Sequence, residues 1–444
     1  MLEAPPDHPQ TADRPRVVLH VGSPKTGTTF LQRVLWDHRE LLREEHGILY
    51  PGADYWDQFH AAVDLQGHFH GDPRPDLAGC WPALVEELRS WSGTAVVSHE
   101  VLAGAEPEDV RRALRDLDHA EVHVVLTARD LGRQLPSRWQ EDVKHGARDT
   151  FEQWWARILE RDEEDVWSRW FWRTTDPLDV LDRWGEVPLD RLHVVTVPRS
   201  GSPWLLWSRF CEVVGVDPHA ADVSRALGSN SSLGVAEVEV YRRVNVALRG
   251  EMAPLPYHQW VKDVLAQEVL AARGSGESPT LPAPLVPAVQ ALAGGWVREI
   301  DARDVDVVGD LDELLPEAAA EGGPTPDGAR EADVAEAAVE ALAEVLERQV
   351  LGAEALEAER SAHEEQLREL HDARSASEDE AGRLRGELEE ALEEALAQRD
   401  ALAAEAARPR GVHGLLVRVL RRAPEPVRRR LLRVRDAVRE RRPR

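Results

Sequence analysis

The sequence predicts an α/β fold with a mainly parallel sheet flanked by helices, followed by a long helical or coiled-coil arm. Two observations lead to this prediction. Short runs rich in Val and Leu alternate with segments whose apolar residues recur at helical spacing. These runs are continuously apolar, which is typical of parallel strands buried on both faces.

The expected strands are four apolar runs, at 17–21, 95–98, 122–127 and 192–197. A last strand or turn is expected at 305–308, where the following GDLDELLP suggests a short helix. Between the runs, helical spacing predicts helices at 28–42, 107–117 and 203–214.

Composition divides the 444 residues into five segments. Residues 1–15 are polar and Pro-rich, as in a loose terminus. The α/β domain is expected at 16–316, and a linker rich in Gly, Pro and small residues at 317–330. An arm of Ala, Glu, Leu and Arg follows at 331–408, and a basic amphipathic tail at 409–444.

The arm and the tail suggest contacts with other molecules. Counting heptads from Leu367, most core positions of the arm are apolar, so a coiled coil and a homo-oligomer are expected, with a lone solvated helix as the alternative. From Arg408 to Arg444 there are 14 Arg against 3 acidic residues. Such a tail suits peripheral contact with an anionic membrane or is simply flexible. Nucleic acid is disfavoured, because the tail lacks aromatic residues to stack on bases.

The remaining composition excludes several classes of protein. The chain has neither an apolar run of about 18 residues nor a signal-like start, so we expect a cytoplasmic protein, with the tail at most reaching the inner membrane face. Cys80 and Cys211 are too few for a disulfide framework or a zinc site. The net charge is −27, so the body that precedes the basic tail is strongly acidic. Lysine occurs only at Lys25, Lys144 and Lys262.

The most informative stretch is VVLHVGSPKTGTTFLQ, residues 17–32. A buried strand leads into a loop that contains Gly22 and Gly27 and then into an amphipathic helix, an arrangement that directs backbone amides at a phosphate. The spacing resembles a Walker A motif. However, Thr28 stands where that motif has Lys, and the Lys lies at position 25, which weakens the case for a kinase or an ATPase.

This loop resembles the 5′-phosphosulfate loop of the sulfotransferase superfamily, in particular its bacterial members. The form P-K-[ST]-G-T-T-[WF] is matched at Pro24, Lys25, Thr26, Gly27, Thr28, Thr29 and Phe30. The resemblance implies that Lys25 stabilises the bridging oxygen as the sulfuryl group leaves and that Phe30 stacks near adenine. It also implies that the loop's amides and hydroxyls hold the 5′-phosphate of 3′-phosphoadenosine 5′-phosphosulfate (PAPS).

A second motif agrees with the first. The strand expected at 122–127 is followed by Arg129, and Ser137 comes eight residues later. Sulfotransferases have an Arg and a Ser at such positions, and the resemblance implies that both bind the 3′-phosphate of PAPS. Arg offers a fork of donors to phosphate and Ser a hydroxyl.

The residues expected to deprotonate the acceptor follow the strand at 95–98. Ser98, His99 and Glu100 match both a Ser/Thr-His pair and a Ser-x-Glu pattern found in the superfamily. Either His99 or Glu100 can act as a general base. Adjacent residues of an extended segment point to opposite faces, so only one of them is expected to face the cleft, and Glu100 is favoured.

The expected activity is transfer of a sulfuryl group from PAPS, without a metal, to a hydroxyl or amine acceptor. The acceptor could be a carbohydrate, a glycolipid or a small metabolite. A Trp-rich region at 154–184 could line the acceptor cleft or belong to the core. The rival functions are a P-loop kinase or nucleotide-binding protein, and a non-catalytic scaffold that acts through the helical arm.

Overall fold

The computed structural model describes residues 14–226, 233–273, 278–317, 323–406 and 424–426. The chain divides into two compact units, Met1–Leu346 and Glu347–Arg444. Nearly all of the predicted loose terminus and of the predicted basic tail lies outside the described residues.

A six-stranded sheet forms the centre of the first unit, and its strand order is β2-β5-β1-β6-β7-β8. All neighbouring pairs are parallel. The strands are β1 (Arg16–His20), β2 (Ile48–Leu49), β5 (Thr94–Ser98), β6 (Glu121–Ala128), β7 (Leu192–Thr196) and β8 (Asp306–Val308). The predicted parallel sheet is thus confirmed, and only the very short β2 was not expected. A separate hairpin joins β3 (His68–Phe69) to β4 (Asp72–Pro73).

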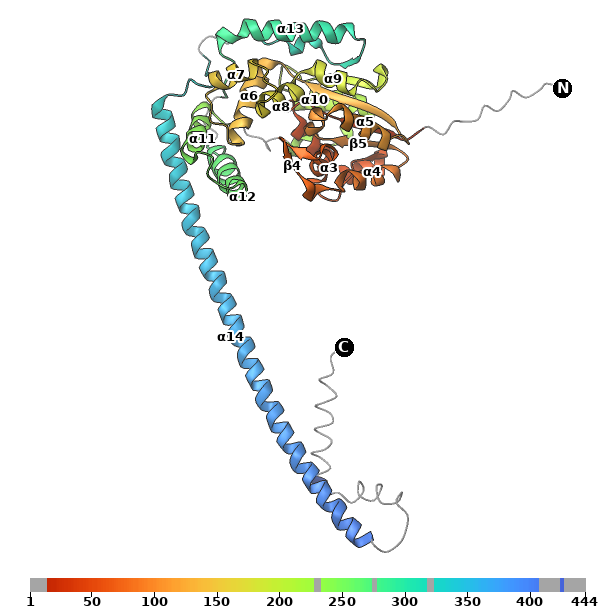
Figure 1. Ribbon diagram of the computed structural model, residues 1–444, viewed down its shortest axis with the longest axis vertical. Coiled ribbons are helices and arrows are strands. Elements are labelled where there is room, and N and C mark those ends of the chain that lie inside the picture. Colours follow the sequence, from red (N-terminus) through yellow and green to blue (C-terminus); the bar gives the residue numbers. More distant parts are fainter. Residues whose placement is uncertain (1–13, 227–232, 274–277, 318–322, 407–423, 427–444) are drawn as a thin grey trace, which may run out of the picture. The chain divides into compact units, whose positions relative to one another are not determined.

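Helices flank this sheet (Figure 1). They are α1 (Thr28–Asp37), α2 (Arg39–His46), α3 (Asp57–Gln66), α4 (Cys80–Arg89), α5 (Pro107–Asp116), α6 (Leu131–Lys144), α7 (Phe151–Leu159), α8 (Val166–Thr175), α9 (Pro177–Trp184), α10 (Pro203–Val214), α11 (Val235–Leu248), α12 (Pro254–Pro256) and α13 (Val286–Ala302). A π-helix, η6, spans Tyr257–Leu270, and short 3₁₀ turns include η2 (Glu100–Gly104) and η8 (Leu311–Leu314).

One expected helix is wrong in extent. The helix predicted at 28–42 is two helices, because the backbone leaves the helical conformation at His38, with φ −113° and ψ 11°. The Nδ1 atom of His38 lies 3.0 Å from the carbonyl oxygen of Val34, the same oxygen that accepts from the His38 amide. A side chain that shares a backbone acceptor in this way weakens the helical ladder.

The core explains why the strands read as continuous apolar runs. Val17 and Leu19 of β1 belong to one buried cluster, whereas Val18 belongs to another. Successive side chains of a strand point to opposite faces, so both faces of the sheet are covered. A third cluster lies among α6, α7, α8, α11 and η6.

The long helix α14 (Glu331–Ala406) confirms the predicted helical arm (Figure 1). Its first turns belong to the first unit, where Val334, Ala337 and Ala341 are buried in the third cluster. Within the predicted linker, the Asp327 carboxylate accepts hydrogen bonds from the amides of Phe151 and Glu152 and so caps α7. The first unit therefore continues past 316 to Leu346. None of the described helices is both long and apolar enough to cross a membrane.

Candidate functional site

The candidate site lies where parallel strands end side by side. Because β5, β1 and β6 are adjacent and parallel, their carboxyl ends meet at one edge of the sheet, the usual place for ligands in such folds. The loop after β1, Glu100 after β5 and Arg129 after β6 come together at this edge. Three predicted site segments are thus brought together by the fold.

The loop at 22–27 has a backbone that requires its glycines. Gly22 and Gly27 have φ values of 54° and 89°. A Cβ at Gly22 would lie 2.7 Å from Thr28 Cγ2, and one at Gly27 would lie 2.6 Å from Leu206 Cδ2. Lys25 also has a positive φ, 69°, although it is not a glycine. Such a conformation is unfavourable for a Lys, and strained residues of this kind are frequent in ligand-binding loops.

Backbone donors are free where the loop enters α1. The first helical bond is donated by Leu31 to Gly27, and no side chain caps this helix. Within the described part of the chain, the amides of Gly27, Thr28, Thr29 and Phe30 have no acceptor. Four unpaired amides and the positive end of a helix dipole together favour an anion.

Buried polar side chains hold the loop from below. Thr26 Oγ1 lies 2.6 Å from Thr127 Oγ1, which in turn lies 3.1 Å from His20 Nε2. The other ring nitrogen of His20 shares a 2.7 Å hydrogen bond with Ser98 Oγ. Complete burial lowers the pKa of His20 to about 4, so the ring is neutral at neutral pH.

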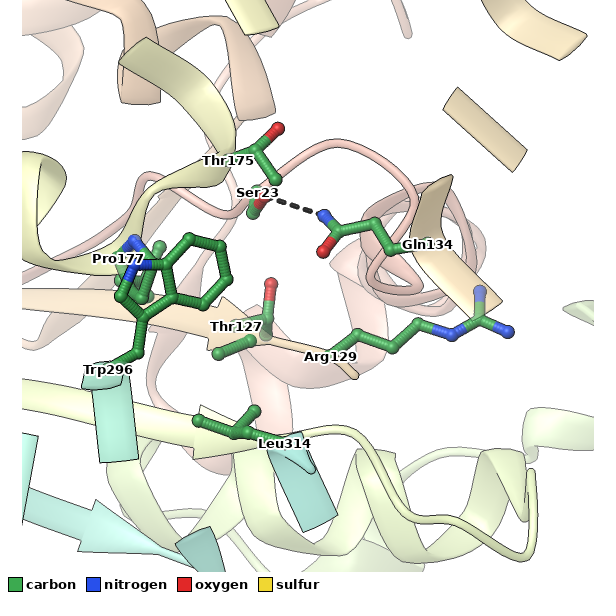
Figure 2. A pocket seen from close by; sticks show the side chains of 10 residues that line it. Ser23, Thr127, Arg129, Gln134, Thr175, Pro177, Trp296 and Leu314 are labelled. Atoms are coloured by element: carbon green, nitrogen blue, oxygen red, sulfur yellow. Dashed lines mark hydrogen bonds between the residues drawn. The ribbon is translucent and has the colours of Figure 1, made fainter. Parts of the chain in front are cut away.

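Gln134 of α6 provides a second support. Its Nε2 donates to Ser23 Oγ at 2.9 Å and to the Pro24 carbonyl at 2.8 Å (Figure 2 shows the bond to Ser23). The side chains of Ser23, Thr127, Gln134 and Thr175 line a cavity of about 10 Å³ in Figure 2. This volume suits about one water molecule, so the cavity belongs to the loop's support and not to a ligand.

Lys25 is held at both ends. Its carbonyl accepts a hydrogen bond from Arg129 Nη1 at 3.1 Å, and its Nζ donates to Glu141 Oε2 of α6 at 2.6 Å. Burial alone would raise the pKa of Glu141, but the charges of Lys25 and Lys144 and a bond from His145 hold that pKa well below its usual range. The Lys25 ammonium therefore faces an ionised carboxylate.

Arg129 retains donors that the described protein groups do not use. Its Nε is buried and has no hydrogen-bond partner among the described residues. Burial, aided by the charge of Arg133, lowers the pKa of Arg129 to about 10. Figure 2 shows the guanidinium directed away from Trp296, past Gln134. A buried guanidinium with spare donors is suited to an anion.

Ser137 and Phe30 are less clearly oriented towards a ligand. The Ser137 hydroxyl donates to the Arg133 carbonyl one turn earlier, at 2.9 Å, and the described hydrogen bonds do not join it to Arg129. Phe30 is partly buried against the cluster that contains Val18. Both residues lie on helices that begin at the site, α6 and α1.

The two candidate bases have different surroundings. The Glu100 carboxylate accepts from Gln32 Nε2 at 2.9 Å and from Thr28, and its Cβ would lie 3.6 Å from a Cβ placed on Gly22. His99 Nδ1 instead accepts from the Val101 amide at 3.2 Å and so caps η2. Glu100 thus faces the loop after β1. However, Glu100 begins η2, and its Oε2 lies 3.9 Å from His99 Nδ1, so the two side chains do not alternate as in an extended segment.

Titration also separates the two residues. Burial would raise the pKa of Glu100, but the charge of His99 and the bonds from Gln32 and Thr28 lower it overall. Burial lowers the pKa of His99, and the nearby Glu100 carboxylate only partly offsets this effect. Both pKa shifts favour an ionised Glu100 beside a neutral His99; in that state the bonds from Gln32 and Thr28, and not a charge on His99, hold the carboxylate.

Most of the Trp-rich region belongs to the core. Trp154, Trp155, Trp172 and Trp184 are buried. Trp170 is partly buried, and its ring centroid lies 4.7 Å from that of His70.

Another depression, of about 470 Å³, lies beside β8 and α10. The one guanidinium in its lining, that of Arg209, is already paired with Glu313 at 2.6 Å. This depression therefore offers an anion little free charge. Within the described ranges, no group of three or more His, Cys, Asp or Glu side chains is arranged to hold a metal ion.

Sequence reasoning missed the supporting side chains, namely Gln32, Gln134 and Glu141. Gln134 and Glu141 are single polar residues on α6, far in sequence from the loop they contact, and Gln32 of α1 contacts Glu100, 68 residues away. Comparison with known proteins adds nothing here, because no family, no curated protein and no solved structure matches the chain. Function must therefore be inferred from the residues themselves.

Proposed function

We propose that the protein is a sulfotransferase that uses PAPS to sulfate a hydroxyl or an amine. The observation that carries this proposal is the loop between β1 and α1. Among the described residues, this loop has four unpaired amides, and its Lys lies at position 25 and not at the Walker A position. Arg129 donates to the loop's backbone, and its Nε has no described partner. These are donors for two separate anionic groups, as PAPS requires.

The residues fit the two ends of PAPS. The amides of residues 27–30 and the hydroxyls of Thr28 and Thr29 would hold the 5′-phosphate. Arg129, with the buried Nε that lacks a partner, would bind the 3′-phosphate together with Ser137. Phe30 would lie near the adenine. PAPS supplies the activated sulfuryl group.

Glu100 is the better candidate for the general base. Its carboxylate is ionised at neutral pH and is fixed beside Gly22 and Thr28 by the bond from Gln32. It would accept the acceptor's proton during transfer. His99 Nδ1 is already engaged with the Val101 amide, so the ring is better suited to hold the start of η2 and to orient Glu100.

Lys25 would stabilise negative charge on the leaving oxygen. A fixed ammonium beside that oxygen lowers the barrier without a metal, because it need not reorganise during the reaction. Glu141 Oε2 holds the Lys25 ammonium in position at a distance of 2.6 Å. The ammonium would then be shared between Glu141 and the reacting group.

A magnesium-dependent kinase or nucleotide-binding protein is the main alternative. One feature favours it: the Glu100 carboxylate lies beside Thr28, where an oxygen ligand of Mg²⁺ could stand. A non-catalytic scaffold acting through α14 is the other alternative. The acceptor class, whether carbohydrate, glycolipid or small metabolite, stays a proposal, as do a cytoplasmic location and contact of the basic tail with an anionic membrane.

Calorimetry with three ligands tests the proposal. A sulfotransferase should bind 3′-phosphoadenosine 5′-phosphate (PAP) without Mg²⁺ and more tightly than Mg·ATP. A kinase should prefer Mg·ATP, and a scaffold should bind neither nucleotide. Transfer of label from radioactive PAPS to components of a cell extract would then identify the acceptor.

A further inference from the structure

The chain contains only three lysines, and the fold brings all of them to one carboxylate. Lys25 Nζ lies 2.6 Å and Lys144 Nζ 4.0 Å from Glu141 Oε2. Lys262, on η6, lies 3.2 Å from His145 Nε2, which is itself 3.4 Å from Glu141 Oε1. We call Lys25, Lys144, Lys262, Glu141 and His145 the lysine cluster.

The charges of the lysine cluster are not balanced. Three ammonium groups face one carboxylate, and of the nearby acids Asp263 is exposed. Asp142 is occupied elsewhere, because it accepts from Trp154 Nε1 at 2.8 Å and lies beside Arg138. Burial lowers the pKa of Lys144; the attraction of Glu141 opposes this effect, and the charges of Lys25 and Lys262 add smaller contributions to it.

Hydrogen bonding in the lysine cluster is also incomplete. His145 Nε2 faces both the Glu141 carboxylate and the Lys262 ammonium, yet one ring nitrogen can either donate to the former or accept from the latter. Lys144 Nζ makes no hydrogen bond among the described residues, and its ion-pair partner Glu141 Oε2 lies 4.0 Å away. The neighbouring His70 has a buried Nδ1 without a partner in the same part of the chain. These donors are left over for an anion with several oxygens.

Lys25 of the lysine cluster belongs to the loop after β1, whereas His145 is connected by ring contacts to the side of the candidate base. A row of rings leads from the candidate base to this histidine: His99 to Phe59 at 5.2 Å, Phe59 to Phe69 at 5.3 Å, Phe69 to His70 at 4.2 Å, and His70 to His145 at 5.8 Å. The proposed 3′-phosphate contact, Arg129, does not take part in this row.

The cluster is also reachable from solvent. The side chains of Lys25 and Glu141 are 31% and 27% exposed, and that of Lys144 is 16% exposed. Lys262 lies on a π-helix, in which Ala271 donates to the carbonyl five residues earlier, and such wide turns are rare and often occur at functional sites.

We propose that the lysine cluster binds an anionic group of the acceptor, a sulfate, phosphate or carboxylate, while the acceptor's hydroxyl or amine lies at Glu100. The proposal rests on the proposed sulfuryl transfer and adds to it that the acceptor is itself an anion. Lysines suit this task, because they act as mobile point charges that can serve differently shaped oxyanions.

The test is titration of inorganic sulfate into protein saturated with PAP, followed by heat-induced unfolding at constant ionic strength. PAP occupies the 5′-phosphate position of the loop, and the variants below then distinguish sulfate bound at Lys144 and Lys262 from sulfate bound in the place of the transferred group beside Lys25. The wild type should be stabilised by sulfate. The double variant Lys144→Met, Lys262→Met should bind sulfate at least about tenfold more weakly and should keep its affinity for PAP within about threefold.

Two further variants serve as controls. Arg111→Gln with Arg115→Gln removes the same charge from the exposed face of α5 and should leave the sulfate effect unchanged. Lys144→Arg with Lys262→Arg keeps the charge and should retain sulfate binding, which excludes a simple folding defect in the Met variant.

Three results would overturn the proposal. In the first, wild type saturated with PAP shows no sulfate effect, or the Met variant shows the same effect as wild type. In the second, PAP affinity falls as much as sulfate affinity, which would assign the cluster to the phosphosulfate end of the donor. In the third, wild type does not bind PAP at all, which would refute the proposed function together with the assignment to an acceptor.

Discussion

Replacing Arg129 by Met should separate ligand binding from folding. If Arg129 is present to bind a phosphate, its buried charge should lower the stability of the unliganded protein. The pKa of Arg129 is lowered from 12.5 to about 10, mainly by burial. A difference of this size corresponds to about 3 kcal/mol against the charged form. The variant loses only the bond to the Lys25 carbonyl, which is worth about 1 kcal/mol.

The free energy of unfolding of unliganded Arg129→Met should therefore not fall, and should rise by up to about 2 kcal/mol. PAP affinity should fall by about 30-fold, because a charge-assisted contact with the 3′-phosphate, worth about 2 kcal/mol, is lost. Affinity for adenosine 5′-phosphate, which lacks that phosphate, should stay within about threefold of the wild-type value.

Urea unfolding at pH 7, followed by the fluorescence of the 15 Trp residues, measures the first quantity, and calorimetry measures the others. Arg183→Met is the matched control. Arg183 is also buried, but it donates to the carbonyls of Ala103, Ala105 and Arg173. Its loss should destabilise the protein by about 3 kcal/mol and leave PAP binding unchanged. If Arg129→Met behaved like Arg183→Met, Arg129 would be a structural support of the loop.

Four other outcomes are expected. Lys25→Ala should lower single-turnover sulfuryl transfer at least about 100-fold while PAP affinity changes little, and equal losses would contradict the role of Lys25. Glu100→Gln should lower the rate by about 10²–10⁴, whereas His99→Asn keeps measurable turnover; the reverse ranking would make His99 the base. The pKa of His20 is about 4 when folded and 6.5 otherwise, so protonation favours the unfolded chain and stability falls as pH drops through this range. In urea unfolding, the His20→Gln variant should lose about 3 kcal/mol less free energy of unfolding than the wild type over this pH range. The same pH dependence in both proteins would refute the role of His20 in this loss. Deleting 347–444 should lower the number of chains per particle in light scattering, unless α14 is a lone helix.

The strands were predictable because the signal that marks them is local. Each apolar run is buried on both faces of the sheet, so every position in it is constrained in the same way. The short strand β2 was not predicted, because two residues show no periodicity. The helix break at His38 was not predicted either, because it depends on a side chain that competes for one backbone carbonyl.

The site could be predicted only in part, for a similar reason. The loop could be predicted from Gly22 and Gly27, because the turn into α1 fixes their spacing. The partner of Lys25, by contrast, lies 116 residues away on α6, and a Glu on a helix has no distinguishing pattern. The meeting of Lys25, Lys144 and Lys262 likewise follows from three-dimensional packing alone.

The way α14 begins has a practical consequence for shortening the protein. Composition suggests a cut near 316 or 330. Either cut would remove Val334, Ala337 and Ala341 from the core, and the cut near 316 would also remove Asp327 from the start of α7. A fragment ending there would expose apolar side chains of the third cluster and would be expected to aggregate on expression. A fragment that ends at Leu346 keeps these contacts, together with the Arg243–Glu331 ion pair. Limited protease digestion of the native chain should accordingly give a resistant fragment that ends inside α14 and not in the Gly- and Pro-rich stretch before it.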